Sequence, residues 1–226
     1  NNGDEKMNIF ALSRNPQEAA EQMIDKHVVK MPTETCQMLH TNQLYFIYKA
    51  TFFKEPSLKD LKVFHTESNS HLMKPAMLNH PSTIWARQSA KNFSWLFEHG
   101  IALCDEYTHR YGKKHGAEER ILMTYFQNKT KPNWPHSGLT PVTIAMFDKY
   151  RLDEKQYSQR NPNWTGWDFV IDSYRHYYLE GKWRFAEWRM NRRPNWFPKN
   201  QYEIKYNEWA LAFNKNHGAN IKLMEV

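Results

Sequence analysis

Apolar residues recur at every third or fourth position along most of the chain, and this spacing is typical of α-helices with one buried face. The clearest pattern begins at His80-Pro81 and ends at Tyr111, with Gly112 as the expected C-terminal stop. Strict alternation of apolar and polar residues is almost absent after Leu12. The pattern predicts a mainly α fold, a single helical domain with a short extended N-terminal segment and loops rich in Pro, Asn and Trp. Shorter helical patterns cover residues 16–31, 33–50, 115–128, 140–150, 168–190 and 202–216, and residues 54–80 form a loop with one helical turn at 57–64.

Three residues set the expected bounds of the first helices. Asn15 is expected to cap the first helix, and Pro16 fits its first position, where a missing N–H costs nothing. Pro32 is expected to kink or restart the helix, because proline cannot donate to the preceding turn and clashes with it.

Composition divides the chain into three parts. Residues 1–6 are polar and precede Met7, which suggests a leader or cloning scar before a natural start. Residues 7–128 are expected to form a catalytic helical core, and residues 129–226 a basic, aromatic helical extension packed on the same domain. No run approaches the roughly 20 apolar residues of a membrane span, so no membrane contact is expected.

The two cysteines and the histidines indicate what chemistry to expect. Cys36 and Cys104 are too few for a disulfide framework, which favours a reducing cytoplasm, and their apolar surroundings favour core positions over a nucleophilic role. The 11 histidines form no metal-binding motif, and the eight glycines form no phosphate-binding loop. We therefore expect neither a metal nor a cofactor.

Charge and aromatic content point to two possible roles. Lys plus Arg is 31 and Asp plus Glu is 24, a net charge of +7, and 15% of residues are aromatic. This composition fits either an aromatic-rich core or a protein that stacks bases and binds anions. Pro-Asn-Trp occurs at 132–134, 162–164 and 194–196. These tryptophans either pin loops onto the core or form aromatic platforms beside cationic loops.

A group of arginines follows the aromatic helix predicted at 168–190. Interleaved tryptophans favour phosphate binding over a merely solvated basic face. Further phosphate or base contacts are expected from Lys74, which precedes the helix predicted from His80, and from His80 and Arg87 in that helix. The candidate nucleic-acid-binding residues are Lys74, His80, Arg87, Arg184, Arg189, Arg192 and Arg193.

The densest polar cluster lies between Asp25 and Glu34. With His27 set at zero on an ideal helix, Lys30 lies at about −60° and Glu34 at about −20°, so the three side chains share one face. A carboxylate, an imidazole and an ammonium on a half-buried face have mutually dependent pKa values, as general acid–base catalysis requires. The alternative is a structural Lys30–Glu34 ion pair with His27 packed nearby.

Several motifs resemble a widespread family of small phage proteins for which no activity is settled. The resemblance predicts a phage origin and a place in the cytoplasm of the infected host cell. The motifs are Met7-Asn-Ile-Phe, Asp25-Lys-His-Val-Val-Lys-Met, Asn79-His-Pro-Ser-Thr-Ile-Trp-Ala-Arg87, Leu103-Cys-Asp-Glu-Tyr-Thr-His-Arg-Tyr-Gly-Lys113 and Arg193-Pro-Asn-Trp-Phe.

The order of features is also similar to the pyrimidine-dimer DNA glycosylases of the phage endonuclease V type. Those are small, basic, mainly helical proteins with a His and, seven residues later, a Glu beside a Pro, as at His27 and Glu34 here. The resemblance implies that Glu34 stabilises the positive charge that develops on the sugar as the base leaves. It also implies an N-terminal amine as nucleophile. Because this sequence begins six residues before Met7, either the mature N-terminus differs or Lys30 or Lys26 provides the amine.

The first functional hypothesis is a DNA glycosylase, with or without lyase activity, that removes a damaged or modified pyrimidine from preferably double-stranded DNA. Glu34 is then the catalytic carboxylate, Lys30 the amine or charge partner, and His27 the orienting or acid–base group. Two alternatives stay open: an enzyme that modifies bases or nucleotides in phage DNA metabolism, and a nucleic-acid-binding protein without catalysis.

Overall fold

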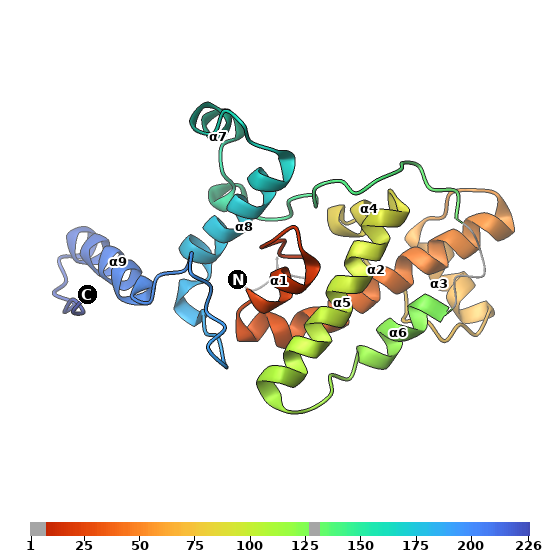
Figure 1. Ribbon diagram of the computed structural model, residues 1–226, viewed down its shortest axis with the longest axis horizontal. Coiled ribbons are helices and arrows are strands. Elements are labelled where there is room, and N and C mark those ends of the chain that lie inside the picture. The colour runs from red at the N-terminus through yellow and green to blue at the C-terminus, as the bar shows by residue number, and fades with distance from the viewer. Residues whose placement is uncertain (1–7, 127–131) are drawn as a thin grey trace.

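The computed structural model describes residues 8–126 and 132–226, which consist of helices joined by irregular segments (Figure 1). The predicted leader, residues 1–6, and the predicted start at Met7 lie outside the described residues. Within them no β-strand occurs, and the mainly α prediction is confirmed. In chain order the elements are α1 (Pro16–Glu21), α2 (Asp25–Phe52), α3 (Leu58–Glu67), α4 (Pro81–Arg87), α5 (Ala90–Tyr111), α6 (Glu118–Phe126), the 3-10 turn η1 (Asp148–Tyr150), α7 (Glu154–Arg160), α8 (Gly166–Gly181), the 3-10 turn η2 (Trp183–Phe185) and α9 (Gln201–His217).

The first helix begins at Pro16 as predicted, whereas the second begins at Asp25 instead of residue 33. The side chain of Asn15 accepts from the backbone N–H groups of the first turn, so its capping role is confirmed. The chain breaks between α1 and α2, where the guanidinium of Arg110 binds the carbonyl oxygens of Glu21 and Met23. The expected restart at Pro32 is wrong, because α2 continues through it, and the expected kink stays a prediction. Packing of α2 against α4 and α5 outweighs the lost hydrogen bond.

The helix predicted from His80 to Tyr111 is in fact two helices. Ser89 ends the run, since its hydroxyl caps α5 by accepting from Asn92 N–H and donates to the carbonyl of Gly138. Gly112 ends α5 with a φ of 69°, as predicted.

Later bounds differ more. The helix predicted at 140–150 is reduced to η1, α8 ends at Gly181 instead of residue 190, and α7 was not predicted. The turn predicted at 57–64 is the longer helix α3, which begins with a capping box between Ser57 and Asp60. The last helix, predicted at 202–216, agrees with α9.

The core lies between α2 and α5, with α1, α4 and α6 around them (Figure 1). Residues from both halves of the chain share it: Phe10, Trp85, Tyr174 and Tyr178 all have exposed fractions below 2%. The segment after residue 131 crosses the molecule past α4 to reach α8, and α9 extends beyond α8.

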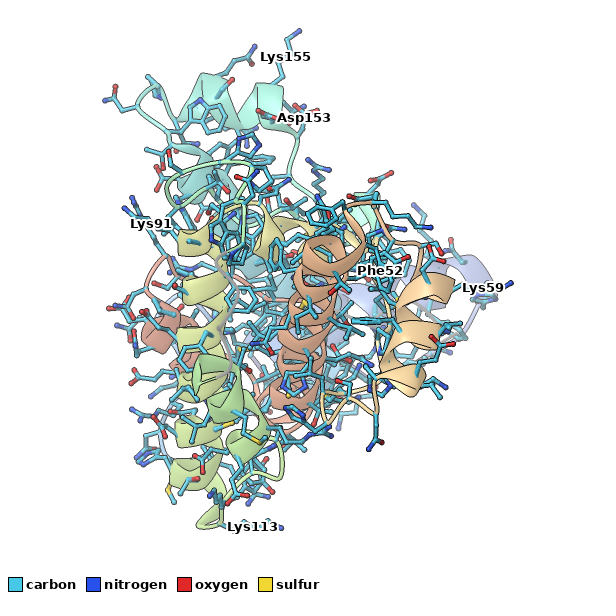
Figure 2. The ribbon with its side chains drawn as sticks, turned by 90° about the vertical axis from the view of Figure 1, so that its right-hand side faces the viewer. Phe52, Lys59, Lys91, Lys113, Asp153 and Lys155 are labelled. Carbon is cyan, nitrogen blue, oxygen red and sulfur yellow. The ribbon has the colours of Figure 1, made fainter. Side chains whose placement is uncertain are left out.

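A second, smaller cluster lies between the C-terminal part of α2 and α3. Phe52 at the end of α2 lies toward α3, where its ring contacts that of Phe64 with centroids 5.6 Å apart, and Lys59 points outward (Figure 2). Among the described residues, no helix combines the length and apolar character that crossing a membrane requires.

Candidate active site and nucleic-acid interface

Lys30 and Glu34 meet on the second and third turns of α2. Nζ of Lys30 lies 3.2 Å from Oε1 of Glu34, and the exposed fractions of the side chains are 45% and 12%. Oε2 of Glu34 is buried and accepts no hydrogen bond within the part of the chain that the structure describes. Burial raises the pKa of Glu34, and the ammonium of Lys30 partly offsets this. The site therefore holds a half-buried carboxylate with one oxygen paired and the other buried without a hydrogen bond among the described residues.

The N-terminal segment lies directly against this carboxylate. The backbone amide of Asn8 faces Glu34 and lowers its pKa, although it does not complete a hydrogen bond to Oε2. Asn8 itself is buried. Two nitrogens are thus adjacent to Glu34: the amine of Lys30 and the backbone nitrogen of Asn8.

His27 lies deeper in the core than the other two residues of the cluster. Its ring stacks on Phe10 with centroids 4.0 Å apart, and Nδ1 lies 2.8 Å from the hydroxyl of Tyr178. Burial first, then the charges of Lys30 and Lys26, lower the pKa of His27 to about 3. The imidazole is therefore neutral at pH 7, which fits an orienting role better than that of a proton donor in the imidazolium form.

Helix α8 contributes residues that sequence reasoning did not single out. Tyr174 and Tyr178 are buried against the N-terminal segment and α2. Lys182, just after α8, is also buried, which lowers the pKa of its ammonium to about 8, and its Nζ lies 4.8 Å from the centre of the Tyr177 ring. The available signal was the spacing of tyrosines at 174, 177 and 178, which is that of one helical face.

His80 and Arg87 have partners inside the protein. Nδ1 of His80 accepts from the N–H of Ser82 and caps α4. Arg87 is buried, and its guanidinium donates to the carbonyl of Leu78 at 2.6 Å and stacks 4.6 Å from the Tyr45 ring centre. DNA contact by Arg87 would require these interactions to break. Lys74 is exposed and lies near Lys62 and Thr66 of α3.

Two of the four arginines after α8 are exposed. Arg184 stacks on the ring of Trp183, 4.3 Å from its centre, and keeps its guanidinium at the surface. Arg189 stacks on Tyr111 at the same distance and lies 3.9 Å from Asp25. Both side chains therefore place an exposed cation against an aromatic ring.

The other two arginines make contacts inside the protein. Arg192 binds Oε1 of Glu106 at 3.0 Å, and Arg193 donates to the carbonyl of Phe197. The same Glu106 oxygen binds Arg110, whose side chain is fully buried and also contacts Asp25. This buried charge cluster ties the segment around Arg192 to α5 and to the start of α2.

The repeated tryptophans pack against neighbouring elements. Trp134 contacts Phe46, with ring centroids 4.8 Å apart, and Trp164 contacts Phe169 at 6.0 Å. Trp196 donates to the side chain of Gln22 at 3.0 Å. All three positions match the loop-pinning interpretation.

Cysteine chemistry has no support in the geometry. Cys36 and Cys104 are free and buried, and burial raises the pKa values of their thiols to about 11 and about 12. Over residues 8–126 and 132–226, no three His, Cys, Asp or Glu side chains are grouped to hold a metal ion.

Comparison with protein families matches residues 7–119, half of the chain, to the family described as pyrimidine dimer DNA glycosylase. The matched span includes His27, Lys30 and Glu34, whereas α8 and the four arginines after it lie outside. No curated protein and no solved structure matches the chain. The resemblance to the endonuclease V type is confirmed, and the resemblance to the broader phage family stays a prediction. The chain belongs to the pyrimidine dimer DNA glycosylase family and is a DNA repair enzyme of the glycosylase type.

Proposed function

We propose that Glu34 is the catalytic carboxylate of this glycosylase and that an amine beside it attacks the sugar. The observation that carries the proposal is the half-buried Glu34, with Lys30 at 3.2 Å and the Asn8 amide facing it, inside the matched span. A carboxylate held there stabilises the cationic sugar more strongly than one in water, because the surrounding protein has a low dielectric constant.

The reaction balances with groups present at the site. The lone pair of the amine attacks C1′ and the bond from C1′ to the base nitrogen breaks. The base leaves with that electron pair and takes the proton that Glu34 accepted from the amine, so Glu34 is a carboxylate again as the cationic sugar forms. One amine proton passes to O4′ as the sugar ring opens, which leaves an iminium between C1′ and the enzyme. Loss of a proton from C2′ and of the 3′ phosphate then cleaves the strand, and this second part is the proposed lyase activity.

Three amines are candidates for the attack. Lys30 is an amine in the chain as it stands, and its ion pair with Glu34 gives its proton an acceptor at 3.2 Å. An α-amine at residue 8 would also lie at Glu34, and α-amines have an ordinary pKa of about 8, which leaves a useful neutral fraction at pH 7. Lys26 is a weaker candidate, because its Nζ lies over the Phe185 ring, 4.4 Å from the centre.

Double-stranded DNA is the proposed substrate. Arg184 and Arg189 are the proposed phosphate contacts, since both residues are exposed and Arg189 lies beside Asp25 at the start of α2. The phosphate role predicted for Arg192 and Arg193 competes with their bonds inside the protein.

The test is excision and trapping on ultraviolet-irradiated duplex DNA with borohydride, with a chelator in a parallel reaction. We expect a covalent adduct and strand cleavage only on irradiated DNA. Glu34→Gln should lower the single-turnover rate by at least about 100-fold while DNA binding is kept. The matched control is Glu55→Gln, the same change at an exposed position near the far end of α2.

Peptide mapping of the trapped adduct identifies the amine, on the peptide that contains Lys30 or on the N-terminal peptide. An unchanged rate for Glu34→Gln would overturn the assignment of Glu34. Binding without excision by the unaltered protein would restore the base-modification and binding-only hypotheses.

A further inference from the structure

The side chain of Asn8 is held in a closed ring of hydrogen bonds that reaches across the chain. The hydroxyl of Tyr174 donates to Oδ1 of Asn8 at 2.9 Å and accepts from the N–H of Ala145 at 3.1 Å. Nδ2 of Asn8 donates to the carbonyl of Ala145. We call these three residues the Asn8 clamp. Two of its members lie outside residues 7–119.

The same amide oxygen also shapes the N-terminal backbone. Oδ1 of Asn8 accepts from the N–H of Ile9 at 2.8 Å and lies 3.3 Å from the N–H of Phe10. Phe10 has a φ of 51°, a left-handed conformation that a bulky residue adopts only when its surroundings impose it. Phe10 in turn stacks on His27. The Asn8 clamp therefore sets both the path of the N-terminal segment and the contact of that segment with α2.

Two of the three clamp residues, Asn8 and Tyr174, are buried, Ala145 is half-buried, and the side-chain polar groups of the clamp are hydrogen-bonded. Tyr174 is fully buried, and the exposed fraction of Asn8 is 5%. Because breaking a buried ring leaves several groups without partners, the ring resists distortion more than separate surface bonds would. The clamp fixes Asn8, and the backbone N–H of Asn8 faces Glu34.

We propose that Tyr174 is a positioning residue that acts through Asn8 to hold the N-terminal segment against Glu34. Tyr174 touches no reacting atom, and its effect is on the geometry of the groups beside the carboxylate. The inference rests on the proposed role of Glu34 and adds to it a structural requirement supplied by α8.

The primary test is Tyr174→Phe, which removes only the hydroxyl. Single-turnover excision should slow by about 10- to 100-fold, because small displacements of reacting groups have effects of this size. The dissociation constant for irradiated duplex DNA should change by less than about twofold, since no DNA contact is removed. The matched control is Tyr157→Phe, which removes a hydroxyl bonded to Asp172 of the same helix α8.

A double-mutant cycle separates positioning from general destabilisation. Asn8→Ala breaks the clamp from its other side, and Asn8→Ala with Tyr174→Phe should be no slower than the more impaired single variant. Additive rate losses, or an unchanged rate for Tyr174→Phe in an active protein, would overturn the inference while leaving the role of Glu34 intact.

A second measurement is independent of catalysis. Besides burial, two groups shift the pKa of Glu34. They are the ammonium of Lys30 on the same helix and the backbone N–H of Asn8 on the N-terminal segment. Since that amide lowers the pKa, loosening the clamp should raise it, which carboxyl ¹³C titration of Glu34 in Tyr174→Phe would detect. An unchanged titration would contradict the inference even if the unaltered protein excised no base.

Discussion

Residues 8–126 and residues 132–226 contribute to the site in different ways. The first region carries the groups proposed for the reaction, Lys30 and Glu34, on one long helix that packs against α5. The second region carries two buried tyrosines, Tyr174 and Tyr178, which bind Asn8 and His27 of the first region. It also carries arginines that reach the surface. The matched half of the chain carries the residues proposed for the chemistry, and the other half carries the contacts proposed to position them.

The two regions are joined by buried charge as well as by apolar packing. Arg110 and Glu106 come from α5 and Asp25 from α2, while Arg192 reaches the same Glu106 oxygen from the second region. Because a carboxylate between two guanidinium groups is neutralised from both sides, removing the more buried partner should cost much more than removing the other.

The largest expected effect concerns this difference. Arg110→Met should lower the free energy of unfolding by about 3–5 kcal/mol, because Glu106 and Asp25 lose their fully buried cation and two carbonyls lose their donor. Arg192→Met should cost less than about 1 kcal/mol, since its side chain is 31% exposed and solvent can replace it. Urea denaturation of both variants checks the order. Equal losses would show that the two regions contribute equally to the charge cluster.

The next effect is the pH dependence of stability, which we expect to originate in the first region. Burial lowers the pKa of His27 to about 3 and those of His40 and His99 to about 4. Below pH 6.5 the unfolded chain binds protons that the folded chain does not, so stability falls as pH falls. Between pH 7.5 and pH 5.5 the loss should be about 1.4 kcal/mol for each histidine.

Unfolding measured at these two pH values tests whether stability falls with pH and whether the buried histidines cause the loss. His40→Gln should reduce the pH-dependent loss by about a third and leave its direction unchanged. A protein as stable at pH 5.5 as at pH 7.5 would contradict the burial of neutral imidazoles in the first region.

The smallest effect concerns DNA affinity and compares one arginine from each region. Arg184→Gln should weaken binding severalfold and reduce the slope of log affinity against log salt by about 1, because one phosphate contact is lost. Arg87→Gln should leave that slope unchanged, since its guanidinium is bonded inside the protein. Affinities measured across a salt series decide. A reduced slope for Arg87→Gln alone would move the interface to the first region.

Local features of the fold could be predicted because local chemistry decides them. Asn15 caps its helix through its side-chain oxygen, and Gly112 ends α5 because glycine, which has no Cβ, adopts a φ of 69° without strain. The shared face of Lys30 and Glu34 follows from helix geometry. The breaks between α1 and α2 and at Ser89 could not be predicted, because Arg110 and Gly138, which stabilise them, are distant in the sequence.

The same distinction applies to the candidate site. Arg87 looks like a phosphate ligand in the sequence, and only its contact with the Leu78 carbonyl and the Tyr45 ring shows its role in the fold. Tyr174 and Tyr178 act on residues more than 150 positions away, which no helical spacing indicates.

The continuity of α2 through Pro32 has a mechanical consequence. Pro32 supplies no N–H to the carbonyl of Val28, so the helix lacks one backbone hydrogen bond between His27 and Glu34. Helices bend most easily where a backbone hydrogen bond is missing. The stiffness of α2 therefore has its minimum inside the turn that bears Lys30, and a load on the helix changes the angle between the His27 end and the Glu34 end before it deforms the rest.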